Sequence, residues 1–345
     1  MDKPFVTIAM PALNEERYIG PAIRSLSRIP ERIDYEILVL DGGSTDRTRE
    51  IVEEFARADP RIRLVPNERR IQSAAVNLAA NVADPRSRYL IRADCHADYP
   101  EGFVERCLDS LERNDATSVV VPMRTVGATC FQKAIATAQN SRLGNGGSAH
   151  RMAGGSQFVD HGHHAAFRRD AFLAAGGYDE TFTHNEDAEL DVRLRRAGGR
   201  IWLEADAAIS YFPRATLPAL ARQYFAHGKG RAKTIRKHGL RPKLRQLLPL
   251  AAVGLALLSL LGAVFEPHLL VVPVAYISAA LLAGALLAVR ETSPCSVASG
   301  LAALAMHSAW AFGFATAFVQ ARKKSPPRGA ASRPREAPIG AIPRR

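Results

Sequence analysis

Tyr35-Glu-Ile-Leu-Val-Leu-Asp-Gly-Gly-Ser-Thr-Asp46 is the stretch of sequence that decides the fold. Its first six residues are mostly apolar, as in a strand buried on both faces of a parallel sheet. The Asp-Gly-Gly turn that follows opens a helix with Ile51, Val52 and Phe55 on its inner face. A buried strand that passes through a glycine turn into such a helix is half of a β-α-β unit.

The same alternation continues on both sides of this stretch. A buried strand at 5–10 precedes it, followed by a helical period with Ile19, Ile23 and Leu26 on one face. Beyond it we expect strands at 61–65, 89–92 and 118–122, and helices at 71–83, 101–113 and 186–197. Strands that alternate with helices of this length predict an α/β fold with a mixed, mainly parallel sheet.

Charge is distributed unevenly along the 345 residues. The chain has a formal net charge of +12, yet residues 1–211 are weakly acidic and residues 212–345 carry the whole basic excess. The segment 212–245 contains ten Lys or Arg and no Asp or Glu. The basicity therefore indicates a partner for the C-terminal part. Because that part adjoins apolar segments, we expect anionic membrane lipids and not nucleic acid as the partner.

Three apolar stretches follow the basic segment, at 247–265, 269–289 and 297–319, and none contains a formally charged residue. Each is about as long as the ~20 residues that a helix needs to cross a bilayer. Three crossings from a cytoplasmic domain would place the tail, with eight Lys or Arg from Arg322 onward, outside. That arrangement conflicts with the positive-inside rule, so either the rule is broken or one segment is re-entrant or interfacial.

These changes in composition divide the chain into four parts. We expect an α/β domain at 1–211, basic juxtamembrane or interfacial helices at 212–245, a membrane region with two to three transmembrane helices at 246–320, and a disordered basic tail at 321–345.

The four cysteines, Cys95, Cys107, Cys130 and Cys295, lie far apart and form no CxxC pair. This spacing argues against a zinc ribbon or a disulfide framework, and it fits a reducing compartment.

Polar residues follow the first two strands where each strand ends, in Pro11-Ala-Leu-Asn-Glu15 and in Asp41-Gly-Gly. Ligands of open α/β sheets bind at this edge. Asp41 can accept hydrogen bonds from a base or a ribose, and the glycines let the backbone approach a ligand closely. The alternative is a plain turn in which Ser44 caps the next helix. The chain has no GxGxxG after either strand and no GxxxxGK[ST], which argues against a dinucleotide-binding dehydrogenase and excludes a P-loop NTPase.

The fourth strand ends in Arg92-Ala-Asp94-Cys-His96-Ala-Asp98. Asp94 and His96 can both reach one divalent cation, with diphosphate oxygens completing the coordination shell. An oxygen-rich site suits Mg²⁺ or Mn²⁺, and the imidazole favours Mn²⁺ slightly. The alternative is a polar loop in which Asp98 caps helix 101–113.

Glu186 and Asp187 open the helix at 186–197, near the positive end of its dipole. Carboxylates there commonly only stabilise a helix, but a pair in a cleft also supplies a general base for a hydroxyl nucleophile. A further group of residues fits either a second metal site or a plain polar loop: His161, His163 and His164, with Asp160 adjacent.

Taken together, these motifs resemble the family 2 glycosyltransferases of the GT-A fold. The resemblance covers about residues 4–230 and is carried by Pro-Ala-Leu-Asn-Glu at 11–15, Leu-Asp-Gly-Gly-Ser-Thr-Asp at 40–46, the Asp94 motif and Asn-Glu-Asp-Ala-Glu-Leu at 185–190. The stretch Arg70-Ile-Gln-Ser-Ala-Ala-Val-Asn77, the form Asp94-Cys-His96-Ala and the C-terminal apolar segments are similar to the ExoA type within this family. That type comprises succinoglycan-biosynthesis glucosyltransferases that act on a polyprenyl-diphosphate-linked saccharide.

The resemblance implies a role for each matching residue. Asp94 is the first Asp of the metal motif, and His96 replaces the second acid. Asp187 is the catalytic base, with Glu186 beside it. The nucleotide sugar is implied to contact Pro11, Glu15, Asp41, Arg70 and Asp94.

Processive synthases of the family carry QxxRW after the base. This chain has Gln223-Tyr-Phe-Ala-His-Gly-Lys-Gly-Arg231 there and lacks the Trp, which favours the addition of a single sugar. The diphosphate or acceptor contacts expected from this segment come from Gln223, His227, Lys229 and Arg231.

The resemblance implies an inverting hexosyltransferase in a bacterial inner membrane, multi-pass, with a cytoplasmic catalytic domain. The expected donor is a nucleotide sugar, UDP-glucose by the ExoA-like features, and the expected acceptor is a polyprenyl-linked saccharide of exopolysaccharide or cell-surface glycan synthesis. The expected cofactor is Mg²⁺ or Mn²⁺. Two alternatives remain open: a polyprenyl-phosphate glycosyltransferase and a non-catalytic membrane-anchored protein that binds nucleotide sugars.

Overall fold

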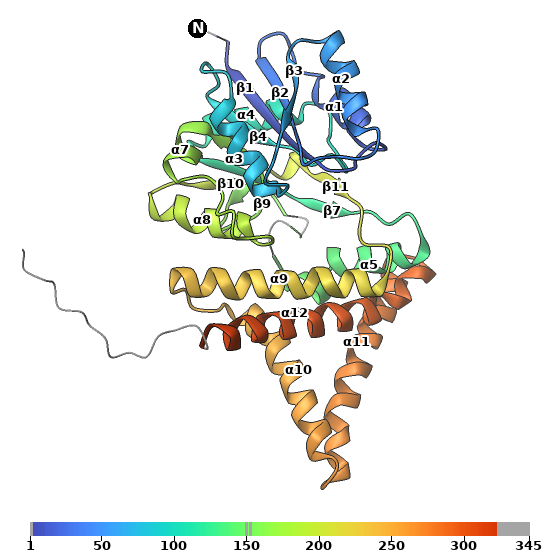
Figure 1. Cartoon of the computed structure of the whole chain (residues 1–345). Coiled ribbons are helices and arrows are strands. Elements are labelled where there is room, and N and C mark those ends of the chain that lie inside the picture. The colour runs from blue at the N-terminus through green and yellow to red at the C-terminus, as the bar shows by residue number, and fades with distance from the viewer. Residues whose placement is uncertain (1–2, 149–150, 152–153, 323–345) are drawn as a thin grey trace, which may run out of the picture.

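The computed structural model describes residues 3–148, 151 and 154–322 (Figure 1). In Figure 1 an α/β unit lies above two long helices, and a helical hairpin projects from the opposite side of these helices. The tail expected at 321–345 lies outside the described residues, apart from its first two positions.

Eleven strands in the described part form two sheets. They are β1 (Phe5–Ala12), β2 (Asp34–Asp41), β3 (Ile62–Pro66), β4 (Tyr89–Arg92), β5 (Ala97–Asp98), β6 (Ser118–Val121), β7 (Met123–Thr125), β8 (Gln157–Phe158), β9 (His163–Arg168), β10 (Ile201–Leu203) and β11 (Ile209–Tyr211). The main sheet has the order β3-β2-β1-β4-β9-β6-β10-β8, and the small sheet has the order β5-β11-β7. The strands from β1 to β4 are parallel, whereas β9 runs antiparallel to both of its neighbours. The prediction of a mixed, mainly parallel sheet is confirmed.

Twelve helices and three described 3₁₀ turns surround and follow the sheets. They are α1 (Ile19–Leu26), α2 (Thr48–Ala58), α3 (Gln72–Val82), α4 (Phe103–Arg113), α5 (Cys130–Asn140), α6 (Arg142–Asn145), α7 (Arg169–Ala174), α8 (Glu186–Arg196), η2 (Ala205–Ala207), α9 (Leu217–His238), α10 (Leu244–Gly262), η3 (Pro267–Leu270), α11 (Val271–Arg290), η4 (Pro294–Ala298) and α12 (Ser299–Arg322). The elements expected from the sequence between residues 5 and 122, and at 186–197, are confirmed to within two residues at each end.

The central strands have an apolar residue at nearly every position because helices cover both faces of the sheet. Ile8 and Ile37 belong to a buried cluster with residues of α1, α2 and α4. Leu38 and Leu40 point to the opposite face and join a second buried cluster with residues of α3, α7 and α8. Burial on both faces explains why the strand signal is a continuous apolar run and not an alternating one.

Glycines allow α9 and α12 to approach each other closely. This pair makes the most extensive helix–helix contact in the described part. A Cβ atom on Gly228 of α9 would clash with the backbone carbonyl of Trp310, and one on Gly313 of α12 would clash with that of Phe225. The two backbones therefore touch at a point that only glycine permits.

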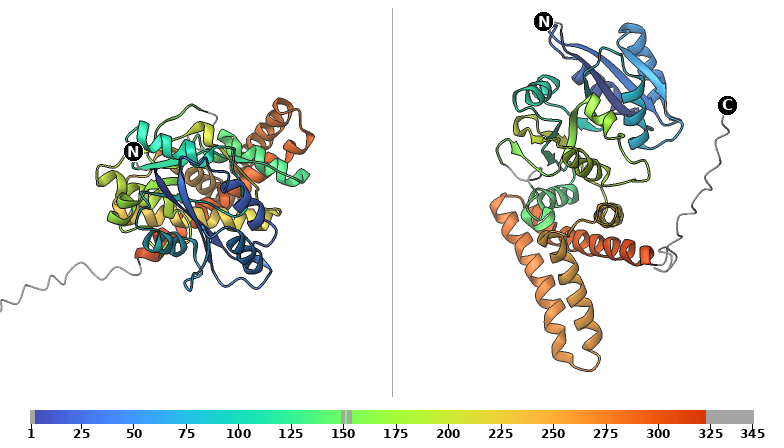
Figure 2. Two further views of the ribbon diagram at one scale, coloured as in Figure 1. Left: turned by 90° about the horizontal axis from the view of Figure 1, so that it is seen from above. Right: turned by 90° about the vertical axis from the view of Figure 1, so that its left-hand side faces the viewer.

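Three helical segments, based on α10, α11 and α12, are long and apolar enough to cross a membrane. This agrees with the three apolar stretches of the sequence. The helices α10 and α11 form the projecting hairpin, whereas α12 lies across the base of the hairpin in both Figure 1 and the right-hand view of Figure 2. A larger share of α12 is buried than of the other two helices.

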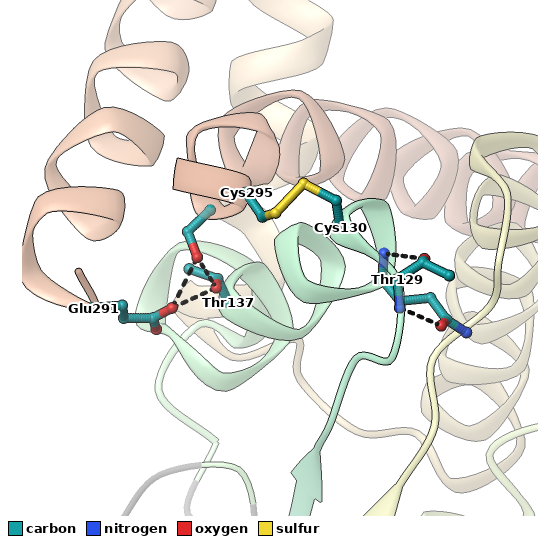
Figure 3. The surroundings of a disulfide bond; sticks show 7 residues. Thr129, Cys130, Thr137, Glu291 and Cys295 are labelled. Atoms are coloured by element: carbon teal, nitrogen blue, oxygen red, sulfur yellow. Dashed lines mark hydrogen bonds between the residues drawn. A yellow bond between two sulfur atoms is a disulfide. The ribbon is translucent and has the colours of Figure 1, made fainter. Parts of the chain in front are cut away.

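The cysteine spacing argued against a disulfide framework, but one pair of cysteines is bonded. Cys130 at the start of α5 is bonded to Cys295 in η4, across 165 residues of sequence (Figure 3). Thr137 of α5 lies beside it and donates a hydrogen bond of 2.5 Å to Glu291, which follows α11. The packing of α5 against η4 brings together cysteines that their sequence spacing does not connect. The cysteines therefore no longer indicate a reducing compartment.

Candidate active site

The polar motifs of the sequence meet at the carboxyl ends of β1, β2 and β4. Ala12 at the end of β1 lies opposite Asp41 at the end of β2, and β4 pairs with the other side of β1. The thiol of Cys95 lies 3.2 Å from the carbonyl oxygen of Pro11. The structure therefore brings the loops that carry Pro11, Asp41 and Asp94 to one edge of the sheet, where open α/β sheets bind ligands.

Asp41 is buried and organises its own turn. Its carboxylate accepts hydrogen bonds of 3.1 Å from the backbone N–H groups of Gly43 and Ser44. Ser44 does not cap α2, because its hydroxyl accepts a hydrogen bond from the backbone of Asn14 at 2.9 Å. Gly43 has φ +87°, and a Cβ atom there would lie 3.3 Å from the guanidinium of Arg70. Arg70 thus covers the Asp41 turn, and both lie within reach of one ligand.

Asp94 is fixed by its neighbours. The side chain of Gln72 donates a hydrogen bond of 2.6 Å to Oδ1, and the hydroxyl of Tyr99 accepts one of 2.6 Å from the Asp94 backbone N–H. Burial raises the pKa of Asp94, but the charge of Arg92, with smaller electrostatic contributions from the neighbouring imidazoles, outweighs it and holds the pKa below its usual range. Asp94 is therefore ionised, and its Oδ2 is not engaged by Gln72.

His96, the other predicted metal ligand, turns toward Glu15. Its Nδ1 lies 3.0 Å from Glu15 Oε1, and this contact raises the pKa of His96 against the effect of burial. No three His, Cys, Asp or Glu side chains within the described ranges form a ready metal site. The donors present, the Asp94 carboxylate and imidazole nitrogen, are types that Mn²⁺ and Mg²⁺ accept, and further oxygens would come from a ligand.

Arg92 lies at the centre of the site, and the sequence analysis did not identify it. Its side chain is 5% exposed and forms ion pairs with three carboxylates: Asp187 at short range, and Asp94 and Glu186 at 3.7 Å each. It also donates a hydrogen bond of 3.3 Å to the hydroxyl of Tyr178. Burial alone would lower the pKa of Arg92, but the surrounding carboxylates raise it well above its usual value. The guanidinium therefore stays charged and holds the acidic residues together.

Asp187 and Glu186 begin α8 and have different electrostatic environments. Burial raises the pKa of Asp187, but Arg92 and His164 outweigh it and keep the pKa far below its usual value. For Glu186, burial and the neighbouring Asp187 charge raise the pKa. Two adjacent carboxylates with pKa values pushed apart are typical of sites that need one reliably ionised base.

The turn before Asp187 rests on α9. Asn185 has φ +69°, and its side chain lies 3.4 Å from the hydroxyl of Thr234. A Cβ atom on Gly230 would clash with the backbone carbonyl of His184. The turn that carries His184 and Asn185, directly before Asp187, is therefore packed against the long helix α9, which also contacts α12.

His163 and His164 enter the site from β9, which pairs with β4. His163 lies between two acids, 3.8 Å from Asp94 and 3.7 Å from Asp187. Burial and the charge of Arg92 lower the pKa of His163 to about 4, so its imidazole is neutral near pH 7. A neutral imidazole beside Asp94 is a possible metal ligand.

His164 belongs to a buried chain of polar groups. Its Nδ1 lies 2.7 Å from the hydroxyl of Tyr178, and its Nε2 lies 2.8 Å from Asp191 Oδ1. Burial lowers the pKa of His164, but the carboxylates of Asp191 and Asp187 outweigh it and raise the pKa to about 9. His164 is therefore charged near pH 7, and its positive charge stabilises the ionised form of Asp187.

The histidine cluster of the sequence does not stay together. His163 and His164 face the acidic residues, whereas Asp160 and His161 line a separate cavity. The sequence contains one signal that separates these residues. His163 and His164 begin the short apolar strand β9, which pairs with β4, the strand that ends at Arg92.

The four α9 residues expected to contact diphosphate differ in their surroundings. His227 is half-buried, and desolvation lowers its pKa to about 3; its ring lies 5.6 Å from that of His184. Arg231, one turn later, is also half-buried, and desolvation lowers its pKa to about 10. Gln223 donates a hydrogen bond of 3.0 Å to Tyr211, and Lys229 is exposed. His227 and Arg231 therefore lie close to the turn before Asp187, whereas Lys229 points away from the protein interior.

Comparisons with known proteins agree with this architecture. A family profile described as "Glycosyl transferase family 2" matches residues 7–174, and one described as "Glycosyl transferase family group 2" matches residues 94–318. The "Succinoglycan biosynthesis protein ExoA" of Rhizobium meliloti is 47% identical over 308 residues, which are 89% of this chain and 93% of the relative.

Two more distant proteins extend the comparison. A Methanococcus voltae protein, "Dolichyl N-acetyl-alpha-D-glucosaminyl phosphate 3-beta-D-2,3-diacetamido-2,3-dideoxy-beta-D-glucuronosyltransferase", is 22% identical over 253 residues, which are 68% of this chain and 74% of the relative. The mannosyltransferase PcManGT of Pyrobaculum calidifontis was solved in complex with GDP-Man and Mn²⁺. Its structure matches this one with a TM-score of 0.57 at 16% identity, and the match covers 91% of this chain and 87% of the mannosyltransferase chain. At this identity the likeness shows the fold, and it confirms the predicted fold class.

His164 makes stability depend on pH in the alkaline range. Its folded pKa of about 9 lies above the unfolded value of ~6.5, so its contribution is complete below pH 6.5 and is lost as the pH rises through 9. We expect the unfolding free energy of the wild type to fall by roughly 3 kcal/mol more than that of His164→Gln across this range. Thermal unfolding of the detergent-solubilised chain between pH 6 and 9.5 measures this difference.

The matched control is His268→Gln, because His268 is exposed in the turn of the hairpin. This variant should follow the wild-type profile. Parallel profiles for the wild type and His164→Gln would show that His164 is neutral in the folded protein.

Proposed function

Because the chain belongs to glycosyltransferase family 2, we propose that it moves a hexose from a nucleoside-diphosphate sugar to a hydroxyl group of a lipid-linked saccharide. The observation that carries the proposal is Asp187, a half-buried, ionised carboxylate that forms an ion pair with Arg92 and lies 3.4 Å from His164. The side chain of His163 lies between Asp187 and Asp94, at the sheet edge where the loops that carry Pro11 and Asp41 meet.

The donor is proposed to lie across the carboxyl ends of β1 and β2. Asp41 would accept hydrogen bonds from the uracil or ribose, while Pro11 and Glu15 line the pocket from the β1 side. Arg70, which covers the Asp41 turn, supplies a positive charge near the phosphates. These contacts bind and orient the nucleotide without taking part in bond breaking.

A divalent cation, Mg²⁺ or Mn²⁺, is proposed to be held by Asp94 and His96, with neutral His163 as a further candidate ligand. It would neutralise the negative charge that grows on the departing nucleoside diphosphate. The structural neighbour from Pyrobaculum calidifontis was solved with Mn²⁺ and GDP-Man, which supports a cation in this fold. His227 and Arg231 are proposed to contribute positive or hydrogen-bonding groups on the α9 side, with Gln223 and Lys229 farther out.

Asp187 is proposed to accept the proton from the acceptor hydroxyl as that oxygen bonds to the anomeric carbon. The bond to the diphosphate oxygen breaks on the opposite face, so a single displacement inverts the anomeric configuration. An ionised carboxylate with a low pKa suffices because the hydroxyl becomes acidic only in the transition state. Glu186, with its raised pKa, lies beside the base and can hydrogen-bond the acceptor.

The pathway is proposed from the relative named as a succinoglycan biosynthesis protein, which supports exopolysaccharide synthesis with UDP-glucose as the donor. The α9 segment lacks the Trp of processive synthases, which supports the addition of one sugar to each acceptor. A chain that makes a lipid monophosphate sugar, or one that only binds the nucleotide sugar, would differ in its products and is distinguished by the first test below.

The chain is proposed to lie in the bacterial inner membrane and cross it twice. The hairpin of α10 and α11 presents exposed leucines on almost every side, as expected for helices in lipid. α12 packs on α9 across the base of the hairpin and would lie at the cytoplasmic surface (Figure 1). Two crossings return the chain to the side of the basic segment 212–245, so the basic sequence after Arg322 begins on the side that the positive-inside rule prefers.

The transfer reaction is tested in membranes that carry the wild type, Asp187→Asn or Asp109→Asn, each supplied with a panel of radiolabelled nucleotide sugars and Mg²⁺ or Mn²⁺. We expect label from one donor to enter the lipid extract with the wild type and with Asp109→Asn, whose exposed carboxylate lies on α4. Loss of the general base should reduce transfer by about a hundredfold or more.

Several outcomes would contradict the proposed function. Equal label with Asp187→Asn would remove this residue from the mechanism. A labelled lipid monophosphate sugar would identify the first alternative. Donor binding without transfer to any lipid supplied, including the cell's own lipid-linked saccharides, would favour the second.

The crossing by α10, with the basic segment on the cytoplasmic side, is tested by single cysteines at opposite ends of this helix, His268→Cys in the turn and Arg241→Cys before the helix. A membrane-impermeant maleimide should label His268→Cys in intact spheroplasts and should label Arg241→Cys only after permeabilisation. The native cysteines give little background, because Cys95 and Cys107 are buried. Equal labelling of both variants before permeabilisation, or protection of both, would contradict the topology.

A further inference from the structure

A second cavity lies outside the candidate active site. Its volume is about 690 Å³, and it opens between the β8–β10 edge of the main sheet and the start of α10. It shares no residue with the proposed donor, metal or base positions. Its lining includes Phe158, Asp160, Arg195, Arg200, Lys243 and Arg245.

The cavity has a surplus of positive charge. Four Lys or Arg side chains line it against a single carboxylate, Asp160. Asp160 pairs with both Arg195, at 3.1 Å, and Lys243. Arg200 stacks over the ring of Phe158 at 4.0 Å from its centroid, and it has no ion pair in the described part. A cluster of guanidinium and ammonium groups that one acid cannot neutralise is suited to a phosphate or diphosphate.

The cavity also adjoins the lipid-facing surface of the molecule. Lys243 directly precedes α10, the first apolar helix. Leu244, Leu247 and Leu248 in the first turns of that helix are exposed, with 73%, 43% and 59% of their surface accessible. A ligand with a phosphate group in the cavity can therefore extend an apolar chain along α10 without leaving the membrane.

We propose that this cavity binds the phosphate groups of a membrane lipid and that, in the proposed reaction, this lipid is the acceptor. The second part rests on the proposed function. The shared chemistry is a phosphate or diphosphate ester of an apolar chain.

The fold connects the cavity to the catalytic base along one side of α8. Arg195 pairs with Asp160, Asp191 accepts a hydrogen bond of 3.3 Å from the backbone of Gly162, and Asp187 lies 3.4 Å from His164. The segment 160–164 thus runs beside α8 from the cavity to the base. Eight residues of helix separate Arg195 from Asp187, a distance of about 12 Å.

This distance sets a requirement on the acceptor. A lipid phosphate held in the cavity is too far from Asp187 to be the nucleophile itself. A saccharide attached to that phosphate can cover the distance and present a hydroxyl at Asp187. Half-buried Arg231 is close enough to both Arg245 and Asp191 for their charges to affect its pKa. The geometry therefore favours a glycosylated lipid over a bare lipid phosphate as the acceptor.

The binding test uses the full-length chain in neutral detergent micelles and radiolabelled farnesyl diphosphate as the probe. Arg200→Gln/Lys243→Gln removes two cavity charges. Arg222→Gln/Arg241→Gln removes two exposed charges from the basic segment 212–245, which also contains Lys243, and is the matched control. We expect the cavity double variant to lose about tenfold or more in affinity, and the control to stay within about twofold. Equal losses in both variants, or no binding by the wild type, would overturn the proposal and leave only non-specific adsorption.

Competition distinguishes the possible sources of the phosphate. Poor competition by phosphatidylglycerol and by inorganic pyrophosphate would support a prenyl-type lipid. Equal competition by phosphatidylglycerol would support a membrane lipid but overturn its role as acceptor. Equal competition by pyrophosphate would overturn the part of the proposal that requires a lipid.

Transfer assays separate this inference from the proposed function. The cavity double variant should raise the KM for the lipid acceptor by about tenfold or more while the affinity for UDP is unchanged. Asp187→Asn should lose transfer yet still bind farnesyl diphosphate like the wild type. An unchanged acceptor KM in the cavity variant would overturn the role in acceptor binding even if the transferase activity itself is established.

Discussion

The candidate site depends on one buried guanidinium. Arg92 at the end of β4 is surrounded by Asp94, Glu186 and Asp187, which come from two distant parts of the sequence. Removing so many charges from water is costly unless each has a partner. The loss of any one of these charged groups would therefore leave an unpaired charge in the protein interior. Arg92 therefore fixes the loop that carries Asp94 to the first turn of α8. It also keeps the pKa of Asp187 low, so that the proposed base is ionised before any ligand binds.

The sequence predicted the parts of this site that local patterns specify. Asp41, Asp94 and Asp187 follow or precede strands and helices whose apolar periodicity is strong, so their positions at element ends were predictable. Arg92 was missed as a site residue, and His163 was named only as part of a separate histidine cluster and not placed beside Asp94 and Asp187. Both environments depend on β9, which runs antiparallel between β4 and β6. No local sequence pattern predicts that strand pairing. The disulfide between Cys130 and Cys295 was missed for the same reason, since only the packing of α5 against η4 brings the two residues together.

The helix α9 links the site physically to the apolar helices. Gly230 lets it pack against the turn that carries the base, and Gly228, half a turn earlier, lets it touch α12. A displacement of α12 would therefore also move α9, and through α9 it would shift the turn before α8. In the proposed two-crossing topology only α10 and α11 cross the membrane, and the chain leaves α12 on the same side as the basic segment 212–245. This arrangement removes the conflict with the positive-inside rule that three crossings create.

The central claim, that Arg92 orients and ionises Asp187, is tested most directly by Arg92→Lys. Lysine keeps one positive charge but loses the planar group that reaches three carboxylates at once. The account predicts that transfer falls by about a hundredfold or more while UDP affinity stays within about threefold, because the donor contacts at Asp41 and Arg70 are intact. Wild-type transfer by Arg92→Lys at unchanged UDP affinity would contradict the claim. Equal loss of UDP binding and transfer would also contradict it, because Arg92 would then only maintain the fold of the donor site.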